Sequence, residues 1–180
     1  MAAARDLLSQ GVTPTIEGAA TAAGISRTTA YRYFPDRQLL VEAAYPEVRE
    51  TSLLPSPAPE DPVERLELTM DAFIDQVTLP WEPQLRAALR VALEAPREGR
   101  TPLRQGRAIG WIEDALLPLR STHPHVDIHQ LAIAIRSATG IESLIWLTDI
   151  AGLTRGDAAA VMKHTAAVLL RDALGVHGKT

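Results

Sequence analysis

The sequence contains no cysteine among its 180 residues. A chain without thiols can form neither a disulfide framework nor a thiolate zinc site. Aromatic residues are also scarce, at 4%, although hydrophobic residues make up 46% of the chain. We therefore expect a core built from aliphatic side chains and alanine, large enough to need no covalent cross-link.

Long, uninterrupted apolar runs are missing as well. No window of about 18 residues is both apolar and uncharged, so we expect no membrane-spanning helix. The N-terminal segment MAAARDLLSQG is amphipathic and lacks the apolar stretch of a signal peptide, which leads us to expect a cytoplasmic protein. Strand-like alternation is rare, whereas Ala, Leu, Ile and Val recur at helical spacing. The sequence therefore predicts an all-α fold.

Residue patterns typical of enzymes are absent too. The chain shows no Ser-His-Asp arrangement, no Gly-rich phosphate loop and no carboxylate pair at a useful spacing, so we expect neither catalysis nor a bound cofactor. One alternating cluster, His123, His125, Asp127 and His129, is a conceivable metal site. Pro124 and a helix start expected at Asp127 would prevent these groups from facing one ion. A solvated loop without metal is the preferred interpretation.

The stretch 15–37 predicts two short helices joined by a tight turn. Apolar residues recur at helical spacing from Ile16 to Ala23. Gly24 can adopt the left-handed conformation that ends a helix, and Ser26 can cap the next one. The second helix has only a narrow apolar stripe, Ala30 and Phe34. Its remaining face is wide and rich in hydrogen-bond donors, which suits insertion into the major groove of DNA.

The boundaries of two domains follow from proline and from helix signals. A short helix at residues 2–10 and a further helix after Asp36, with Leu39, Leu40 and Ala43 inward, complete a small N-terminal bundle. The run 54–59 holds three prolines at alternate positions, which is typical of a linker. We therefore assign residues 1–45 to a DNA-binding domain and residues 46–180 to a larger helical domain.

The second domain is expected to begin helices at several marked positions. Asp61 and Pro62 form a cap followed by proline in the first turn, and Asp127 and Thr154 are further expected caps. The helix from about Ile128 to Ile150 and the last helix, to about residue 174, are rich in apolar and small residues. We expect these last two helices of two copies to form a four-helix interface. Burial of both within one monomer is the alternative.

The charge of the chain is unevenly distributed. The net charge is −4, but residues 26–37 hold three arginines against Asp36, a local charge of +2. Residues 1–45 hold four arginines and four acids, whereas residues 46–180 hold 14 basic and 18 acidic residues. The acidic surplus therefore lies outside the expected DNA-binding domain. A weak overall field means that binding would depend on dimerisation and base contacts.

The chain has a short N-terminal helix, then the motif AAGISRTTAYRYFPDRQLL at residues 22–40, then a larger all-helical portion. Together these closely resemble the TetR family of bacterial transcriptional regulators. The family pattern reads roughly Gly-Val-Ser-x-x-Thr-(Leu/Ile)-Tyr-x-(His/Tyr)-Phe-x-x-Lys-x-x-Leu, and the match extends over about 30 residues. Beyond residue 45 only the helical architecture and length agree. Two departures are Gly18, inside the first helix of the pair, and Ala30, in place of a larger aliphatic residue. The matching residues are Gly24, Ile25, Ser26, Thr29, Tyr31, Tyr33, Phe34, Arg37 and Leu40.

The resemblance implies a sequence-specific regulator that binds double-stranded operator DNA as a homodimer through its last two helices. It implies a repressor released by a small apolar effector; control by a protein partner is the alternative. By position, Arg27, Thr28 and Tyr31 would reach base edges, and Arg32 would contact either bases or phosphates. The phosphate contacts implied are Thr15, Thr29, Tyr33 and Arg37.

Large apolar side chains on different predicted helices are candidates for an effector pocket in the second domain. Pockets between helices are commonly lined in this way, but the same residues could equally form ordinary core. The candidates are Met70, Phe73, Trp81, Trp111 and Trp146.

Overall fold

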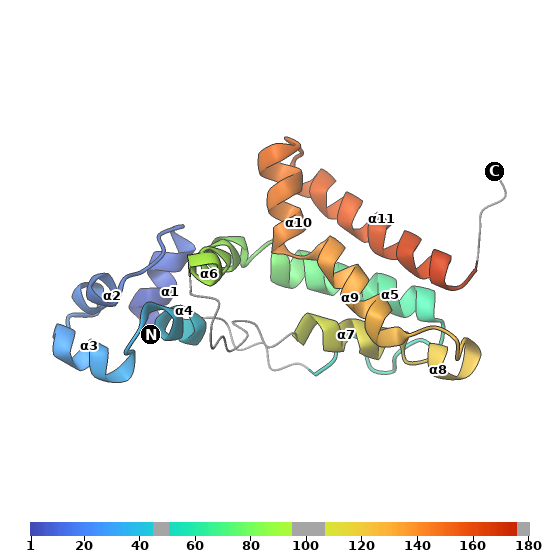
Figure 1. Cartoon of the computed structure of the whole chain (residues 1–180), viewed down its shortest axis with the longest axis horizontal. Coiled ribbons are helices and arrows are strands. Elements are labelled where there is room, and N and C mark those ends of the chain that lie inside the picture. The colour runs from blue at the N-terminus through green and yellow to red at the C-terminus, as the bar shows by residue number, and fades with distance from the viewer. Residues whose placement is uncertain (45–50, 95–106, 176–180) are drawn as a thin grey trace. The chain divides into compact units, whose positions relative to one another are not determined.

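A computed structural model describes residues 1–44, 51–94 and 107–175. The predicted all-α class is confirmed, because every regular secondary-structure element in this described part is a helix and none is a strand (Figure 1). The chain forms two compact units. The first comprises Met1–Val48 and Trp81–Gln105, and the second comprises Arg49–Pro80 and Gly106–Thr180.

The first unit is built from five described helices around a core of small side chains. These are α1 (Ala2–Ser9), α2 (Ile16–Ala23), α3 (Arg27–Tyr33), α4 (Arg37–Ala44) and α6 (Glu82–Glu94). Most residues of this core are alanines, so it holds few large interlocking side chains. The buried cluster comprises Ala4, Leu8, Ile16, Ala19, Ala20, Ala30, Leu40, Ala44 and Ala87.

Helix α6 belongs to this first unit, although it lies beyond the domain boundary predicted at residue 45. It packs against α1 and α4, and Ala87 is 3% exposed within the core of the unit. Ala88 and Val91 of α6 form a second buried cluster with Val41 of α4. The Nη1 of Arg90 also donates to Thr13 Oγ1 at 2.9 Å. The proline-rich run that indicated a boundary does not separate this helix from the N-terminal helices.

Packing of α6 against α4 shifts the buried face of α4 by one position from the predicted one. The expected inward residues were Leu39, Leu40 and Ala43, but Leu39 is 42% exposed and Ala43 is exposed. Leu40, Val41 and Ala44 are buried instead. Both sets have helical spacing, so periodicity alone does not distinguish them. Packing of Val41 against α6 decides which stripe is buried.

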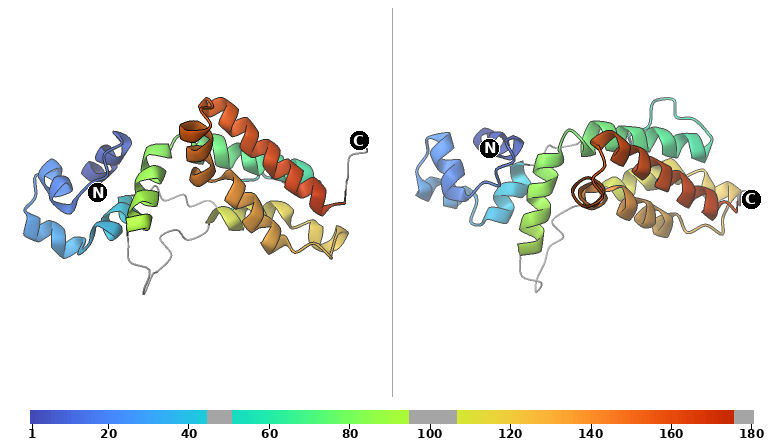
Figure 2. Two further views of the ribbon diagram at one scale, coloured as in Figure 1. Left: turned by 45° about the horizontal axis from the view of Figure 1, so that its top comes forward. Right: turned by 90° about the horizontal axis from the view of Figure 1, so that it is seen from above.

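The second unit centres on four helices: α5 (Pro62–Asp71), α7 (Arg107–Leu116), α9 (Ile128–Thr139) and α11 (Arg155–Ala173). Each packs against two of the others, α5 and α9 each contacting α7 and α11 (Figure 2). The shorter elements are η1 (Ala72–Thr78), which continues α5 as a π-helix, then α8 (Leu119–Thr122), α10 (Ile141–Ile145) and η2 (Trp146–Ile150). Side chains fully buried in this unit include Leu66, Met70, Ile74, Ile112, Leu116, Ile135, Leu144, Met162 and Leu170.

Helix caps in the second unit form where the sequence predicts them. The side chain of Asp61 accepts from the N–H of Val63, and Pro62 occupies the first helical position. The side chains of Asp127 and Thr154 cap α9 and α11 in the same way. These side chains satisfy backbone N–H groups that would otherwise lack a partner.

The helix predicted from Ile128 to Ile150 is interrupted at Gly140, where the backbone turns to an extended conformation with φ −90° and ψ −175°. Taken as one stretch of 23 residues with a mean hydropathy of 1.2, it is long and apolar enough to cross a membrane. It is the one such stretch among the described residues, and 33% of its most apolar window is buried. A core helix can pass the same test, so length and composition assign it no membrane role.

Candidate nucleic-acid interface

The turn between α2 and α3 is held by the residues that the sequence singled out. Gly24 adopts φ +66° in the left-handed region, where residues with a side chain are strained. Its N–H donates to Thr21 O, and the N–H of Ile25 donates to Ala20 O at 3.0 Å. Ser26 Oγ then accepts from the N–H of Thr29 at 3.1 Å and caps α3. The predicted pair of short helices and the caps at this turn are confirmed.

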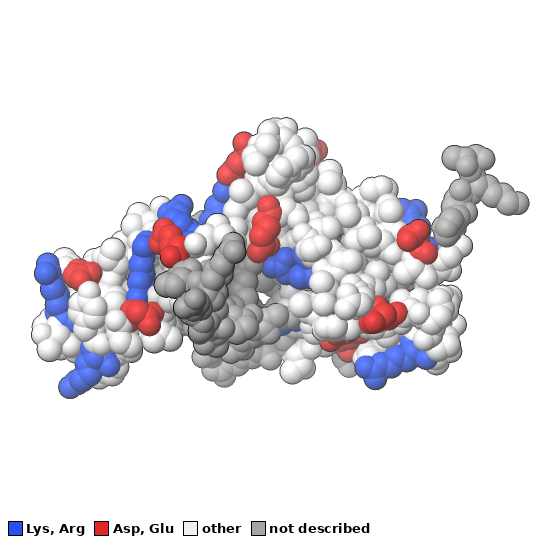
Figure 3. All heavy atoms as spheres, viewed as in Figure 1, with Lys and Arg blue, Asp and Glu red and all other residues white. Residues whose placement is uncertain are grey.

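Helix α3 buries one side and exposes the other. Ala30 is 5% exposed and Phe34 packs partly buried against the core of the unit. Arg27, Thr28 and Tyr31 are exposed, and their spacing of i, i+1 and i+4 places them on one helix face. Figure 3 shows basic side chains gathered at the end of the first unit where α3 lies, with an acidic side chain among them. The structure thus groups the three residues assigned to base edges.

The other candidates differ in what their side chains already contact. Thr15 Oγ1 caps α2 by accepting from Gly18 N–H at 3.0 Å, and its hydroxyl still carries a proton to donate. The Thr29 hydroxyl lies 2.8 Å from Ser26 Oγ and takes part in the cap of α3. Tyr33 is 65% exposed, with the Arg32 guanidinium 5.4 Å from its ring centre. Tyr33 and Arg32 are therefore both accessible to a ligand of this surface.

Arg37 has structural contacts that the sequence did not reveal. Its Nε donates to the Pro14 carbonyl at 3.1 Å, and its Nη1 lies 3.3 Å from Glu94 Oε2. The guanidinium thus ties the segment before α2 to the end of α6. Its side chain remains 36% exposed. No periodic signal could have shown this contact, because Glu94 is 57 residues away in sequence.

Glu17 is a further residue of this surface that sequence reasoning missed. Its Oε1 accepts a hydrogen bond of 2.5 Å from the Tyr31 hydroxyl, which joins the first turn of α2 to α3. This hydrogen bond is the main reason why the pKa of Glu17 is lowered and the pKa of Tyr31 is raised. The positive charge of Arg27 lowers the pKa of Glu17 further and partly offsets the rise in the pKa of Tyr31. The two residues are 14 apart in sequence, beyond any helical periodicity.

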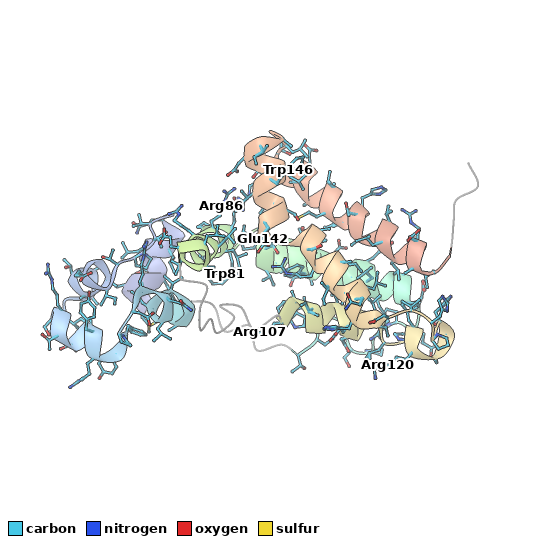
Figure 4. The ribbon with its side chains drawn as sticks, in the orientation of Figure 1. Trp81, Arg86, Arg107, Arg120, Glu142 and Trp146 are labelled. Atoms are coloured by element: carbon cyan, nitrogen blue, oxygen red, sulfur yellow. The ribbon has the colours of Figure 1, made fainter. Side chains whose placement is uncertain are left out.

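Four of the five candidates for an effector pocket belong to the second unit, and two of these four pack against each other. Phe73 and Trp111 are buried and pack with ring centres 6.1 Å apart, and Met70 is 2% exposed. Trp81 belongs to the first unit and is half-buried. Trp146 is 56% exposed on η2, close along the chain to Glu142 of α10 (Figure 4).

A pocket of about 180 Å³ lies between α5 and α11 of the second unit. Met70 is the one effector candidate that lines it. At its edge, Lys163 Nζ is 2.8 Å from Asp71 Oδ1 and 2.7 Å from Asp75 Oδ2. The lining residues are Val63, Leu66, Glu67, Met70, Asp71, Lys163, Ala166, Ala167 and Leu170.

The histidine cluster near residue 125 does not converge on one point. His129 Nδ1 is 2.5 Å from Glu113 Oε1 of α7, whereas His123 and His125 pack their rings edge to face at 5.9 Å. Within residues 1–44, 51–94 and 107–175, no group of three or more His, Cys, Asp or Glu side chains is placed to hold a metal ion.

Comparisons with protein-family models, with curated proteins and with solved structures found no match.

Proposed function

We propose that the protein is a non-enzymatic, sequence-specific DNA-binding regulator of the cytoplasm, similar to TetR-family repressors, in which α2 and α3 form a helix-turn-helix. The observation that carries this proposal is the exposed face of α3, where Arg27, Thr28 and Tyr31 lie together after a capped glycine turn. A short helix presenting polar side chains outward matches the way such helices enter the major groove.

Each candidate residue then has a role set by its chemistry. Arg27 donates two hydrogen bonds to guanine O6 and N7, an arrangement worth roughly 1–3 kcal/mol of discrimination. Thr28 and Tyr31 contact neighbouring base edges. Phosphate contacts fix the register of the helix on the duplex without reading sequence. They come from Thr15, Thr29, Tyr33 and Arg37, with Arg32 on either bases or phosphates.

The proposed regulator acts as a homodimer through its last two helices. On α11, Val161 and Val168 are 41% and 42% exposed, and on α9, Ile133 is 38% exposed. Apolar side chains on these two helices would be covered by the same helices of a second copy. A dimer presents two recognition helices about one DNA turn apart, which adds the affinity that one weakly charged unit lacks.

Release from DNA has two candidate triggers. A small apolar effector would occupy the second domain, but the pocket beside Met70 measures about 180 Å³, below the roughly 300–1,000 Å³ of most ligand sites. Control by a protein partner is favoured by Trp146 and Ile150, which are 56% and 70% exposed on η2. Adding partner protein or small apolar compounds to the DNA complex separates these alternatives by which of them lowers affinity.

The DNA-binding proposal is tested with the full chain and duplexes selected from a randomised pool, together with palindromes from the DNA that flanks the gene. Arg27→Ala is expected to weaken binding about tenfold or more and to relax the preference at one guanine. Arg120→Ala is the matched control, because Arg120 is exposed on α8 in the second unit. The proposal fails if the wild-type chain selects no sequence, or if Arg27→Ala leaves affinity and base preference unchanged.

A further inference from the structure

The Tyr31 hydroxyl on the exposed face of α3 has a single proton, and that proton is already engaged. The hydroxyl donates to Glu17 Oε1 at 2.5 Å. An ionised carboxylate accepts hydrogen bonds and donates none, so the direction of this bond is fixed by chemistry. What the Tyr31 oxygen can still offer to a ligand is its lone pairs.

Both ends of this hydrogen bond are held by the fold. Glu17 lies in the first turn of α2, which is capped by Thr15. The neighbouring Ile16 is buried in the core and only 5% exposed. Tyr31 follows Ala30, which is buried against the same core, while Tyr31 itself is 44% exposed. The hydrogen bond to Glu17 of α2 therefore fixes the orientation of the Tyr31 hydroxyl, while a substantial part of the Tyr31 side chain remains accessible.

The protonation states of Glu17 and Tyr31 agree with a hydrogen bond donated by Tyr31. The hydrogen bond from Tyr31 is the largest cause of the lowered pKa of Glu17, and the same bond is the largest cause of the raised pKa of Tyr31. The carboxylate therefore stays charged and the phenol stays protonated at neutral pH. Arg27 also carries positive charge that favours the ionised carboxylate.

We propose that Glu17 is a positioning residue that accepts the hydrogen bond from the Tyr31 hydroxyl, so that Tyr31 meets DNA as a hydrogen-bond acceptor and selects a base that carries an exocyclic amino group. In the major groove such donors are N4 of cytosine and N6 of adenine, whereas thymine O4 and guanine O6 are acceptors. An acceptor facing an acceptor leaves both unsatisfied. Tyr31 thus favours an amino base over a keto base at one position on one strand.

This inference rests on the proposed DNA-binding function and adds a prediction that the function alone does not make. A free tyrosine hydroxyl can rotate to donate or accept, so it would discriminate poorly between amino and keto bases. Removing the Glu17 carboxylate restores that freedom. It also removes a negative charge near phosphates, which raises affinity for every duplex. The informative quantity is consequently the ratio of the affinities for duplexes with an amino base and with a keto base at that position, and not the overall affinity.

The test compares full-length variants on four duplexes that differ only at the position read by Tyr31, identified as the position whose preference changes in Tyr31→Phe selections. The wild-type chain is expected to favour the amino bases about tenfold, in line with other single-base contacts. In Glu17→Ala the ratio should fall to about twofold or less, because the hydroxyl is then free to donate. Glu17→Gln should retain most of the ratio, since its amide oxygen still accepts from Tyr31.

Asp6→Ala is the charge control, because it removes an exposed carboxylate from α1 of the same unit. It should leave the amino-to-keto ratio unchanged, and circular dichroism should show the same helical content in all variants. Failure of the wild-type chain to bind any duplex specifically would overturn the proposed function. Specific binding in which Glu17→Ala keeps the wild-type ratio, or in which keto bases are preferred, would overturn this inference alone.

Discussion

The guanidinium of Arg136 occupies the space that a side chain at residue 140 would need. A Cβ placed at Gly140 would lie 1.6 Å from Nη1 and 2.4 Å from Cζ of Arg136. In this position Arg136 lies 3.3 Å from Glu142 Oε2 and 5.8 Å from the ring centre of Phe73. Gly140, at the interruption between α9 and α10, thus leaves room for an ion pair that spans the break.

We expect Gly140→Ala to destabilise the second unit by about 1 kcal/mol, the low end of the range for overpacked sites. The backbone at Gly140 has a negative φ that alanine can adopt, so the loss comes from displacement of Arg136 from Glu142 and Phe73. The effect is small for such a close approach because the guanidinium lies at the end of a flexible side chain. Urea unfolding followed by circular dichroism measures it.

The double variant Arg136→Ala/Gly140→Ala separates this cause from a backbone effect. Once the guanidinium is gone, the added methyl group of Gly140→Ala should change stability little, giving a coupling of roughly 1 kcal/mol between the two sites. Equal destabilisation by Gly140→Ala in both backgrounds would show that the backbone, and not Arg136, requires glycine.

Gly24→Ala is expected to destabilise the first unit by about 1–2 kcal/mol, because it forces a side chain into the left-handed conformation. The residue has φ +66° and nothing within 4 Å of an added Cβ, so strain of the backbone is the whole effect. Thermal unfolding provides the measurement. Gly24→Asn is the matched control and should lose less stability, since asparagine tolerates this conformation. Equal losses in the two variants would argue against this cause.

The ion pairs of Lys163 predict a dependence of stability on pH. Burial alone lowers the pKa of Lys163, but hydrogen bonds to Asp71 and Asp75 and their charges outweigh it and raise the pKa above its ordinary 10.5. A raised pKa means that the stabilisation is complete below about pH 10 and is lost as the pH rises through the folded-state value. Unfolding free energies of wild-type protein and Lys163→Met should therefore differ more at about pH 8 than at about pH 11.5. A difference that is constant or grows would contradict this assignment.

Arg37 is expected to serve both the fold and DNA binding. Arg37→Ala should lower stability by about 1 kcal/mol through loss of the Pro14 and Glu94 contacts. It should also reduce the slope of log affinity against log salt by about 1, the amount expected for one lost phosphate contact. Glu94→Gln weakens only the ion pair and should leave the salt slope unchanged. An unchanged slope in Arg37→Ala would restrict Arg37 to a structural role.

The glycine turn and the helix caps were predictable from the sequence, because each depends on one residue and its near neighbours in the chain. The turn at Gly24 and the caps at Asp61, Asp127 and Thr154 depend on residues within three positions, and all of them form as expected. The outward face of α3 follows equally from its short apolar stripe.

Contacts between distant segments were not predictable, because periodicity shows that a helix has a buried face but not what covers it. Val41 turns inward because α6 covers it, and α6 is separated from it by about forty residues of sequence. The Glu17–Tyr31 bond and the Arg136–Glu142 pair likewise join different helices. The contact between Phe73 and Trp111 likewise joins η1 to α7.

The place of α6 in the first unit has a consequence for how the protein is made. During synthesis, α1 to α4 leave the ribosome well before Ala87, which fills part of their core. The core of the first unit is therefore complete only after α5 and α6 have also emerged. Until then, the nascent N-terminal helices expose apolar surface. A fragment that ends at residue 45 would lack this part of the core, so we expect helices α1 to α4 to fold as part of a chain of at least 94 residues and not as a separable module.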